Sequence, residues 1–339
     1  MRERRIVQVI RSHGFAGVER YVTEVSNELA LRDWNVTVIG GEPTRMQASL
    51  DPRIQFLHGM STWGAARALR RLAPIPLVHA HMTAAEFAAV LTKPVTDAKI
   101  LTTRHFATPR GSSALVRAVA DRLARGLDGE IAISEFVANS IVGNQIVLLN
   151  GVRPEPKSQD GKNILVMQRL EPEKDTATAI EAFALSGLGR TGWRLLIAGR
   201  GTQEVPLRQL ATSRGLDARA VFMGFVEDAR SLRTAGGLFL APAPAEPYGL
   251  SVVEAMAAGV PVVAADGGAH RETLGRTGYF FPPGDAKTCS LLLRQLAEDD
   301  TQRQTAAVAV RARHQDVLTL KGHVDALESV YCHLIGGEP

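Results

Sequence analysis

Two glutamates, Glu246 and Glu254, stand eight residues apart around the segment of this sequence best suited to chemistry. After Gly249, an Ala-rich run predicts a short helix that stops at Gly259. Free backbone amides at the start of a helix favour an anion. Glu254 lies four residues past Leu250, hence one turn deeper and about 6 Å along the axis, roughly the step from a phosphate to its ribose. The spacing predicts that one segment binds a sugar, a diphosphate and a ribose in order.

The rest of the sequence alternates apolar runs with helical segments, and these elements must position that helix. Continuous apolar strands between helices indicate parallel sheets that are covered on both faces. In the first half we expect helices near residues 18–31 and 113–126, and strands at residues 6–10, 36–39, 54–57, 77–80, 100–103, 130–134 and 146–149. In the second half we expect strands at residues 163–167, 194–198, 220–223, 237–241, 260–264 and 278–281.

Residues 150–162 are rich in Pro, Gly and charge and predict a linker between the two sets of strands. A chain of 339 residues also suits two domains, since single cores rarely grow past about 250 to 300 residues. We predict an α/β protein with two doubly wound Rossmann-like domains, residues 1–152 and 160–315, and a terminal helix at 316–335. Ligands bind beyond the carboxyl ends of such strands, so we expect two parallel sheets facing across a cleft.

Residues 245–268 resemble the donor-binding signature of retaining glycosyltransferase family 4, a Glu-x7-Glu motif followed here by AMAAGVPVVAADGG. Other segments are similar to family segments in the expected order, namely GFAGVER (14–20, with Ala16 where a second glycine is common), VLLNGV (147–152), QRLEPEKD (168–175), LLIAGRG (195–201), VFMGFV (221–226) and FFPPGD (280–285). The similarity spans about residues 5–285. It implies the GT-B fold, a first domain that binds an acceptor, a second that binds a nucleoside diphosphate sugar, and a last helix that crosses back onto the first domain.

Arg169 and Lys174 flank a turn after an expected strand, so they lie at its carboxyl edge. Glycosyl transfer puts negative charge on the departing diphosphate, which a metal ion or fixed cations and dipoles must stabilise. Metal-dependent transferases of the other common fold usually show Asp-x-Asp, and this sequence has none. We therefore expect no metal ion and no cofactor beyond the donor substrate. The resemblance implies that both cations bind the donor diphosphate; the alternative is an ordinary surface pair near Glu171 and Glu173.

The resemblance also implies roles for the residues around the Glu-x7-Glu motif. The amides of Gly249 and Leu250 meet the distal phosphate, Glu254 accepts hydrogen bonds from the ribose diol, and Glu246 contacts the donor sugar hydroxyls. Family 4 enzymes retain the anomeric configuration, and a path in which the diphosphate assists the incoming hydroxyl requires no enzyme nucleophile. Further expected substrate contacts come from Gly17, Arg200, Phe225, Val226, Tyr248 and Ser251.

Histidines follow two expected strands of the first domain. The resemblance places His105 near the transferred sugar, although a lone His is more often structural. His79 and His81 form too small a set for a convincing metal site, so a structural role or an acceptor contact is favoured. Arginines form two clusters in the first domain, one of Arg67, Arg70 and Arg71 and one of Arg117, Arg122 and Arg125. These clusters indicate contact with an anionic acceptor or a lipid surface; the alternative is that they are solvated helix faces.

Composition excludes several classes of protein. Aromatic residues are only 5% and charges are scattered around a net +4, which disfavours nucleic acid as a partner. Cys289 and Cys332 are far apart with no Cys-x-x-Cys, which predicts reduced thiols. The first apolar run has five residues, too short for a signal peptide, and no run approaches the roughly 18 residues of a membrane span. We expect a cytoplasmic protein.

The sequence thus predicts a metal-independent, retaining glycosyltransferase that moves a sugar from a nucleoside diphosphate sugar to an acceptor hydroxyl. The acceptor is a saccharide, a natural product or a lipid-linked glycan, and peripheral membrane contact stays open. A non-catalytic nucleotide-sugar-binding protein and a same-fold epimerase or phosphorylase are the alternatives. A nicotinamide dehydrogenase is disfavoured because the first glycine loop lacks the GxGxxG spacing and Gly40-Gly41 stands where an acidic residue is needed.

Overall fold

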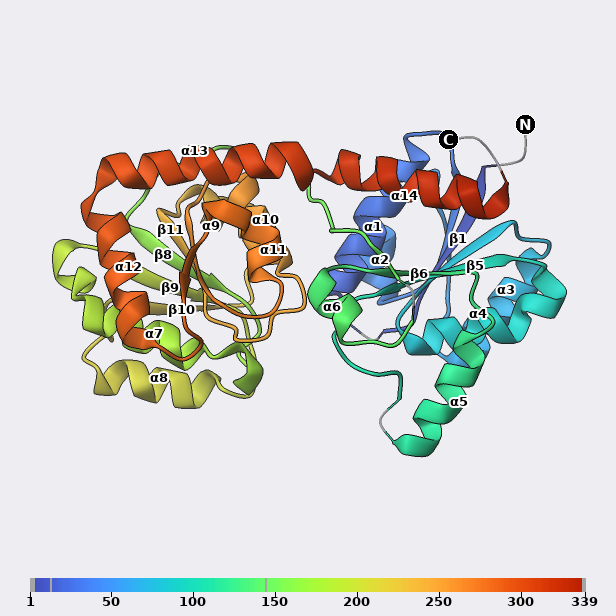
Figure 1. Cartoon of the computed structure of the whole chain (residues 1–339), viewed down its shortest axis with the longest axis horizontal. Helices are drawn as coiled ribbons and strands as arrows, with labels where there is room; N and C mark the ends of the chain where they lie inside the picture. The colour runs from blue at the N-terminus through green and yellow to red at the C-terminus, as the bar shows by residue number, and fades with distance from the viewer. Residues whose placement is uncertain (1–3, 13, 112, 144, 337–339) are drawn as a thin grey trace. The chain divides into compact units, whose positions relative to one another are not determined.

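The computed structural model describes residues 4–12, 14–111, 113–143 and 145–336, apart from the side chains of residues 114 and 115 (Figure 1). Its contacts divide the chain into two compact units. Unit 1 holds the residues up to Asn150 and those from Leu320 on, and unit 2 holds Gly151–Thr319.

Unit 1 is built on a seven-stranded parallel sheet with the order β3-β2-β1-β4-β5-β6-β7. Its strands are β1 (Arg5–Ile10), β2 (Asn35–Gly40), β3 (Gln55–Leu57), β4 (Leu77–His81), β5 (Lys99–Arg104), β6 (Gly129–Ala132) and β7 (Ile146–Val147). Its helices are α1 (Gly17–Ala30), α2 (Pro43–Ser49), α3 (Thr62–Leu72), α4 (Thr83–Thr96), α5 (Ala114–Ala124), α6 (Glu135–Asn139) and α14 (Leu320–Ile335). Because side chains alternate along a strand, Ile6 and Ile10 pack with α1 and α14, whereas Val7 and Val9 pack with α3 and α4.

Unit 2 is built on a six-stranded parallel sheet with the order β10-β9-β8-β11-β12-β13. Its strands are β8 (Asn163–Met167), β9 (Arg194–Ala198), β10 (Ala220–Gly224), β11 (Leu238–Ala241), β12 (Val262–Ala265) and β13 (Tyr279–Phe281). Its α-helices are α7 (Thr176–Ser186), α8 (Glu204–Ser213), α9 (Ala229–Thr234), α10 (Leu250–Ala257), α11 (His270–Leu274), α12 (Ala286–Glu298) and α13 (Asp300–Val317), with 3-10 turns η1 (Pro172–Lys174), η2 (Leu188–Thr191) and η3 (Gly275–Thr277).

A strand is present at each predicted position, which confirms the α/β class and its two doubly wound parallel sheets. Some strand ends differ. β6 ends at Ala132 rather than at residue 134, because Ser134 Oγ accepts a hydrogen bond from the Val137 amide (3.1 Å) and caps α6. β12 begins at Val262 rather than at residue 260, because the backbone at Gly259 turns through the left-handed region (φ 71°).

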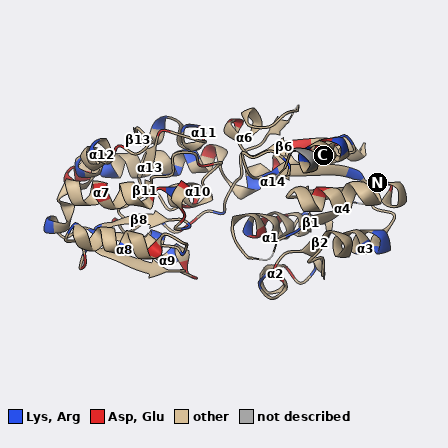
Figure 2. Ribbon diagram, turned by 90° about the horizontal axis from the view of Figure 1, so that it is seen from below, with Lys and Arg blue, Asp and Glu red and all other residues tan. Residues whose placement is uncertain are grey.

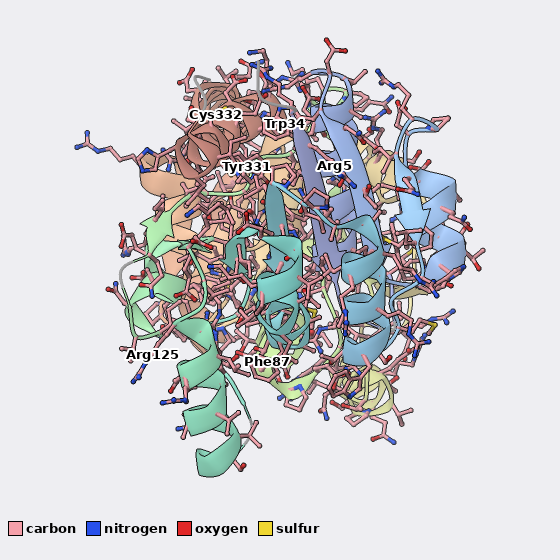
Figure 3. All side chains as sticks on the ribbon, turned by 90° about the vertical axis from the view of Figure 1, so that its right-hand side faces the viewer. Arg5, Trp34, Phe87, Arg125, Tyr331 and Cys332 are labelled. Carbon is pink, nitrogen blue, oxygen red and sulfur yellow. The ribbon has the colours of Figure 1, made fainter. Side chains whose placement is uncertain are left out.

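The last helix, α14, belongs to the core of unit 1. Leu320, Val324, Leu327 and Tyr331 recur at helical spacing and pack in the same core as β1 and α1. The Tyr331 ring lies edge-on to the ring of Trp34, with centroids 5.5 Å apart, and both are labelled in Figure 3. The sequence placed the start of this terminal segment at residue 316, but α13 continues to Val317, so the change of unit comes at Leu320.

The predicted linker at residues 150–162 packs against unit 2. The Glu155 carboxylate is buried and bonded to the Arg233 guanidinium, and the Glu155 carbonyl accepts from Arg311 Nη2 (3.1 Å). Asp160 forms an ion pair with Arg303 (2.7 Å). Three arginines from helices of unit 2 therefore hold this segment against that unit.

Charged residues of both signs are scattered over the helices of each unit, with no continuous basic stripe along the part of the chain that Figure 2 draws. Cys289 and Cys332 are free and buried, as the spacing predicted. No helix of the described residues is both long enough and apolar enough to cross a membrane.

Candidate active site

Helix α10 starts directly after Gly249, whose backbone has φ 87° and ψ 60°. This left-handed region favours glycine, because a Cβ is strained there. No side chain caps the helix, so its first amides are directed at whatever lies beyond its start. Leu250 and Ser251 are half-buried in that first turn. The backbone has the form that the sequence predicted for an anion site, and the binding of an anion stays a prediction.

The structure brings together Glu246 and Lys174, which are 72 residues apart in the chain. Lys174 Nζ donates to Glu246 Oε2 at 2.5 Å, and the two side chains are only 14% and 16% exposed. Lys174 follows β8 and Glu246 follows β11, and these strands are neighbours in the parallel sheet. A Cβ on Gly249 would lie 3.4 Å from Glu246 Cγ, so this ion pair stands beside the start of α10.

Two glycines at the end of the motif fix the loop that carries Glu246. A Cβ on Gly267 would lie 2.0 Å from the Pro244 carbonyl oxygen, and one on Gly268 would lie 2.3 Å from the Glu246 carbonyl oxygen. Any larger residue would push the loop away, since real Cβ atoms do not approach so closely. The Gly-Gly pair that follows β12 therefore positions the predicted catalytic carboxylate.

His270 is a residue of this site that sequence reasoning missed. It is 1% exposed, and its Nδ1 lies 2.9 Å from the Ala265 carbonyl oxygen. A carbonyl only accepts, so Nδ1 carries the proton and Nε2 is left as an acceptor. Burial lowers the pKa of His270, and the nearby charges of Glu246 and Lys174 act on it in opposite directions. The signal in the sequence was its place two residues after the Gly-Gly end of the motif.

Arg169 pairs with Glu173 rather than with Lys174 or Glu246. Its side chain is 63% exposed and donates to Glu173 at 2.8 Å, the surface pairing that the sequence left open as the alternative. The turn is held instead by Gln168, whose amide nitrogen donates to the Lys174 carbonyl (2.8 Å) and to Thr176 Oγ1 (2.9 Å). Lys174 is thus the fixed cation, and the exposed Arg169 side chain remains accessible to a ligand.

Glu254 is buried rather than presented on the surface of α10. It is 7% exposed, and its Oε2 accepts from Arg233 Nη1 at 3.0 Å. The remaining donors of Arg233 bond to Glu155, so two carboxylates share one buried guanidinium. Burial alone would lower the pKa of Arg233, but the hydrogen bonds of Glu155 and the charge of Glu254 raise it. The positions of these residues in the sequence do not predict their pairing, and the ribose contact of Glu254 stays a prediction.

The other predicted residues of unit 2 follow neighbouring strands. Arg200 follows β9 and is exposed, and Phe225 and Val226 follow β10, with Phe225 50% exposed. These three side chains are open to a ligand at the carboxyl edge of the sheet. Tyr248 differs, because its ring is only 2% exposed and its carbonyl accepts from Thr273 Oγ1 (3.0 Å). Any contact of Tyr248 with a substrate would therefore come from its backbone.

In unit 1, His105 follows β5 and is 7% exposed. Its Nε2 lies 3.1 Å from His81 Nδ1, and His81 Nε2 lies 2.8 Å from Gln8 Oε1. Burial lowers the pKa of His105 to about 3, and the charges of His323 and Arg104 act in the same direction. The ring is therefore neutral. His79 is fully buried, and both of its ring nitrogens have hydrogen-bond partners within the protein. These contacts favour a structural role for His79 over a contact with the acceptor.

Gly17 is the first residue of α1 and is exposed, with a helical rather than a left-handed backbone. The Glu19 carboxylate accepts from the Ala16 amide (2.8 Å) and so caps this helix. Nearby in the sequence, the two residues after β1 carry buried polar atoms, Arg11 Nε and Ser12 Oγ, that have no hydrogen-bond partner among the described residues. Such atoms at a strand end indicate a place where a ligand would complete the hydrogen bonding.

The described residues contain no group of three or more His, Cys, Asp or Glu side chains arranged to hold a metal ion.

Two family models match consecutive parts of the chain. Residues 15–154 match the model described as Glycosyltransferase Family 4, and residues 152–313 match the one described as Glycosyl transferases group 1. The exopolysaccharide phosphotransferase SCO2592 of Streptomyces coelicolor is 34% identical over 154 residues, 44% of this chain and 16% of that protein. The phosphatidyl-myo-inositol mannosyltransferase of Mycobacterium leprae is 33% identical over 212 residues, 56% of this chain and 55% of that protein. The chain thus spans only part of the length of these curated relatives.

A solved structure shows the same fold over almost the whole chain. The structure of Anabaena Alr3699/HepE in complex with UDP superposes with a TM-score of 0.83 at 19% identity, covering 97% of this chain and 100% of that one. Together with the two parallel sheets, this likeness confirms the predicted GT-B fold.

Proposed function

We propose that this chain, a glycosyltransferase of the GT-B and family 4 type, transfers a sugar from a nucleoside diphosphate sugar to an acceptor hydroxyl, retains the anomeric configuration and needs no metal ion. The observation that carries the proposal is the Lys174–Glu246 pair beside the uncapped start of α10. It joins a fixed cation, a fixed carboxylate and an anion-favouring helix terminus at one edge of one sheet.

This arrangement suits the departure of a diphosphate. Cleavage of the anomeric carbon–oxygen bond places negative charge on the leaving group. The Lys174 ammonium and the first amides of α10 are held in place before the reaction, so they stabilise that charge without reorganisation. Arg169 and Arg200 are exposed, and in this proposal they bind the outer phosphate oxygens. Together with Lys174 and the helix amides, they stabilise the leaving group without a metal ion.

Retention follows if the acceptor enters on the face from which the diphosphate leaves. The acceptor hydroxyl forms the new bond to the anomeric carbon, and its proton passes to an oxygen of the departing diphosphate. No enzyme nucleophile is then required, and Glu246 instead accepts hydrogen bonds from the donor sugar hydroxyls. Lys174 balances the charge of Glu246 before the sugar arrives. Glu254 contacts the ribose, while Phe225 and Val226 border the base.

Unit 1 supplies the acceptor site in this proposal. The relatives include a phosphatidyl-myo-inositol mannosyltransferase, which supports a lipid-linked or saccharide acceptor here. All six arginines of the two predicted clusters are exposed. Helix α5 projects from the rest of unit 1 in Figures 1 and 3 and exposes Val116 and Val119 beside its arginines. These features favour an anionic acceptor or peripheral contact with a lipid surface in the cytoplasm.

Nucleotide binding is tested by thermal shift with UDP, GDP and dTDP in the presence of EDTA. At least one of them raises the melting temperature of the wild-type protein, Lys174→Ala abolishes the rise, and Lys287→Ala, an exposed lysine on α12, preserves it. A rise that requires a divalent metal would contradict the metal-independent mechanism.

Turnover separates an enzyme from a nucleotide-sugar-binding protein. The nucleoside diphosphate that shifts the melting temperature selects the donor sugars to be tested, and NMR of the product reports its anomeric configuration. Retention supports the front-face path, whereas inversion refutes it. Interconversion of the donor sugar without transfer would favour the same-fold epimerase instead.

A further inference from the structure

A chain of buried hydrogen bonds in unit 1 runs from Thr103 to His105 through His79, Tyr331, Gln8 and His81. A separate pair of buried bonds joins the Tyr21 hydroxyl to His323 and His323 to the Leu149 carbonyl. The eight side chains of these bonds are all 7% exposed or less: Gln8, Tyr21, His79, His81, Thr103, His105, His323 and Tyr331. Because each link has one donor and one acceptor, the donor sense of Gln8 Nε2 gives the direction of the bonds from Thr103 to His105.

The separate pair of bonds runs from Leu149 to Tyr21. A carbonyl only accepts, so His323 Nδ1 carries its proton toward Leu149 (2.8 Å). Burial lowers the pKa of His323 to about 4, against the opposing effect of that bond, so the ring is neutral and Nε2 is an acceptor. The Tyr21 hydroxyl therefore donates to His323 Nε2 (2.9 Å).

The first links of the chain run from Thr103 to Gln8. Gln8 Nε2 donates to the Tyr331 hydroxyl, whose own proton goes to His79 Nδ1, so His79 Nε2 donates to Thr103 Oγ1 (2.7 Å). Burial lowers the pKa of His79 well below its usual value, which leaves Nδ1 of the neutral ring as an acceptor. The Tyr331 hydroxyl donates to that nitrogen (2.7 Å), and its oxygen then accepts from Gln8 Nε2 (3.3 Å).

The last links reach His105. With its nitrogen bonded to Tyr331, Gln8 presents Oε1 to His81, and His81 Nε2 must donate to it (2.8 Å). Burial keeps His81 neutral, so its Nδ1 accepts from His105 Nε2 (3.1 Å). His105 thus carries its proton on Nε2 and a lone pair on Nδ1. Among the described residues, the ring makes no other hydrogen bond, and its small exposed area leaves Nδ1 as the atom that can meet a ligand.

We propose that Gln8, His81 and Tyr331 are positioning residues that hold His105 as the Nε2-protonated tautomer, so that its Nδ1 accepts a hydrogen bond from a substrate hydroxyl. The substrate contact rests on the proposed function, whereas the tautomer does not. A hydroxyl that donates to His105 keeps its own oxygen lone pairs exposed, and a group that can only accept is rejected at this position. His105 is by the same reasoning unable to serve as an acid.

The chain also gives α14 a role in the site. Tyr331 comes from this helix, and its hydroxyl joins Gln8 to His79 in the chain that reaches His105. The terminal helix thus sets the donor and acceptor sense of a ring that follows β5, more than 200 residues earlier in the sequence.

The tautomer is measured by NMR on the full-length protein with 15N-labelled histidine, with His105→Asn identifying the signals of His105. The wild-type ring is expected to show a protonated Nε2 and an unprotonated Nδ1 at pH 7.5. A proton on Nδ1 of the wild-type ring, or an even mixture of the two forms, would overturn the proposal.

Two variants test the positioning residues. Gln8→Leu removes the acceptor for His81, and Tyr331→Phe keeps the packed ring but removes the hydroxyl, so each is expected to give a mixture of His105 tautomers. Ser26→Ala is the matched control, because the Ser26 hydroxyl is buried in unit 1 without a partner among the described residues. An unchanged His105 tautomer in folded Tyr331→Phe would refute the relay.

Kinetics with the donor and acceptor identified by the turnover assay test the substrate contact. Tyr331→Phe is expected to lose about tenfold to a hundredfold in kcat/KM, since a misdirected ring proton leaves a buried polar group unpaired. Ser26→Ala is expected to match the wild type. If His105 has the Nε2-protonated form but no donor supports glycosyl transfer, the proposed function is refuted and the relay stands. If the wild-type protein shows a mixture of tautomers but is fully active, the relay is refuted and the proposed function stands.

Discussion

Replacement of Arg233 by Met leaves two buried carboxylates without their cation. Arg233 is 3% exposed, and its partners Glu155 and Glu254 are 9% and 7% exposed. Removal of one partner from a buried ion pair costs about 3–5 kcal/mol, because the remaining charge is uncompensated. For a unit of this size each kcal/mol shifts the melting temperature by about 2–4 °C. Unit 2 is therefore expected to melt about 6–20 °C lower in Arg233→Met.

Differential scanning calorimetry measures this shift, with Arg230→Met as the matched control. Arg230 lies on the same helix and is exposed, so its loss is expected to change the melting temperature by no more than a few degrees. Neutralising the partners in Arg233→Met/Glu155→Gln/Glu254→Gln is expected to recover part of the loss. The reasoning is refuted if Arg233→Met melts within a degree or two of the Arg230 control.

Further variants probe the site and the buried histidines. Gly249→Ala strains a left-handed backbone (φ 87°) by about 1–2 kcal/mol and displaces the start of α10. The affinity for the nucleoside diphosphate, measured by calorimetry, should therefore fall about tenfold. Gly215→Ala is the control: Gly215 also has a left-handed backbone (φ 69°) but lies in open space, so this variant should keep the affinity. Glu246→Ala should reduce turnover more than nucleoside diphosphate affinity, and equal losses in kinetics and calorimetry would count against its contact with the sugar. The pKa values of His105 and His323, about 3 and about 4, lie below the unfolded value near 6.5. The stability that these neutral rings contribute is complete above pH 6.5 and is lost as the pH falls toward their pKa values in the folded protein. Urea unfolding of unit 1 should therefore show about 2 kcal/mol less stability per histidine at pH 5 than at pH 7. A free energy of unfolding that does not change with pH would contradict their burial as neutral rings.

The strands were predictable because their cause is local. An apolar run such as residues 163–167, bounded by polar turns, forms a buried parallel strand whatever lies elsewhere in the chain. The start of α10 was predictable for the same reason, since Gly249 and the Ala-rich run after it are adjacent in sequence. Even the meeting of Lys174 and Glu246 follows in outline from the rule that ligands gather at the carboxyl ends of parallel strands.

Long-range polar contacts were not predictable from the sequence. Glu155 has the composition of a linker residue, and only its burial against Arg233 reveals a structural role. Gln8 and Tyr331 are 323 residues apart, and neither residue type marks a partner at that distance. Periodicity identifies apolar faces, but it carries no information on which buried polar side chains satisfy one another.

The central claim is that Lys174 and the first amides of α10 bind the donor diphosphate without a metal ion. A crystal structure of the protein grown with EDTA and the nucleoside diphosphate that raises its melting temperature tests this directly. We expect phosphate oxygens within hydrogen-bond distance of Lys174 Nζ and of the Gly249 and Leu250 amides. A diphosphate bound elsewhere, with Lys174 still paired only to Glu246, would contradict the account.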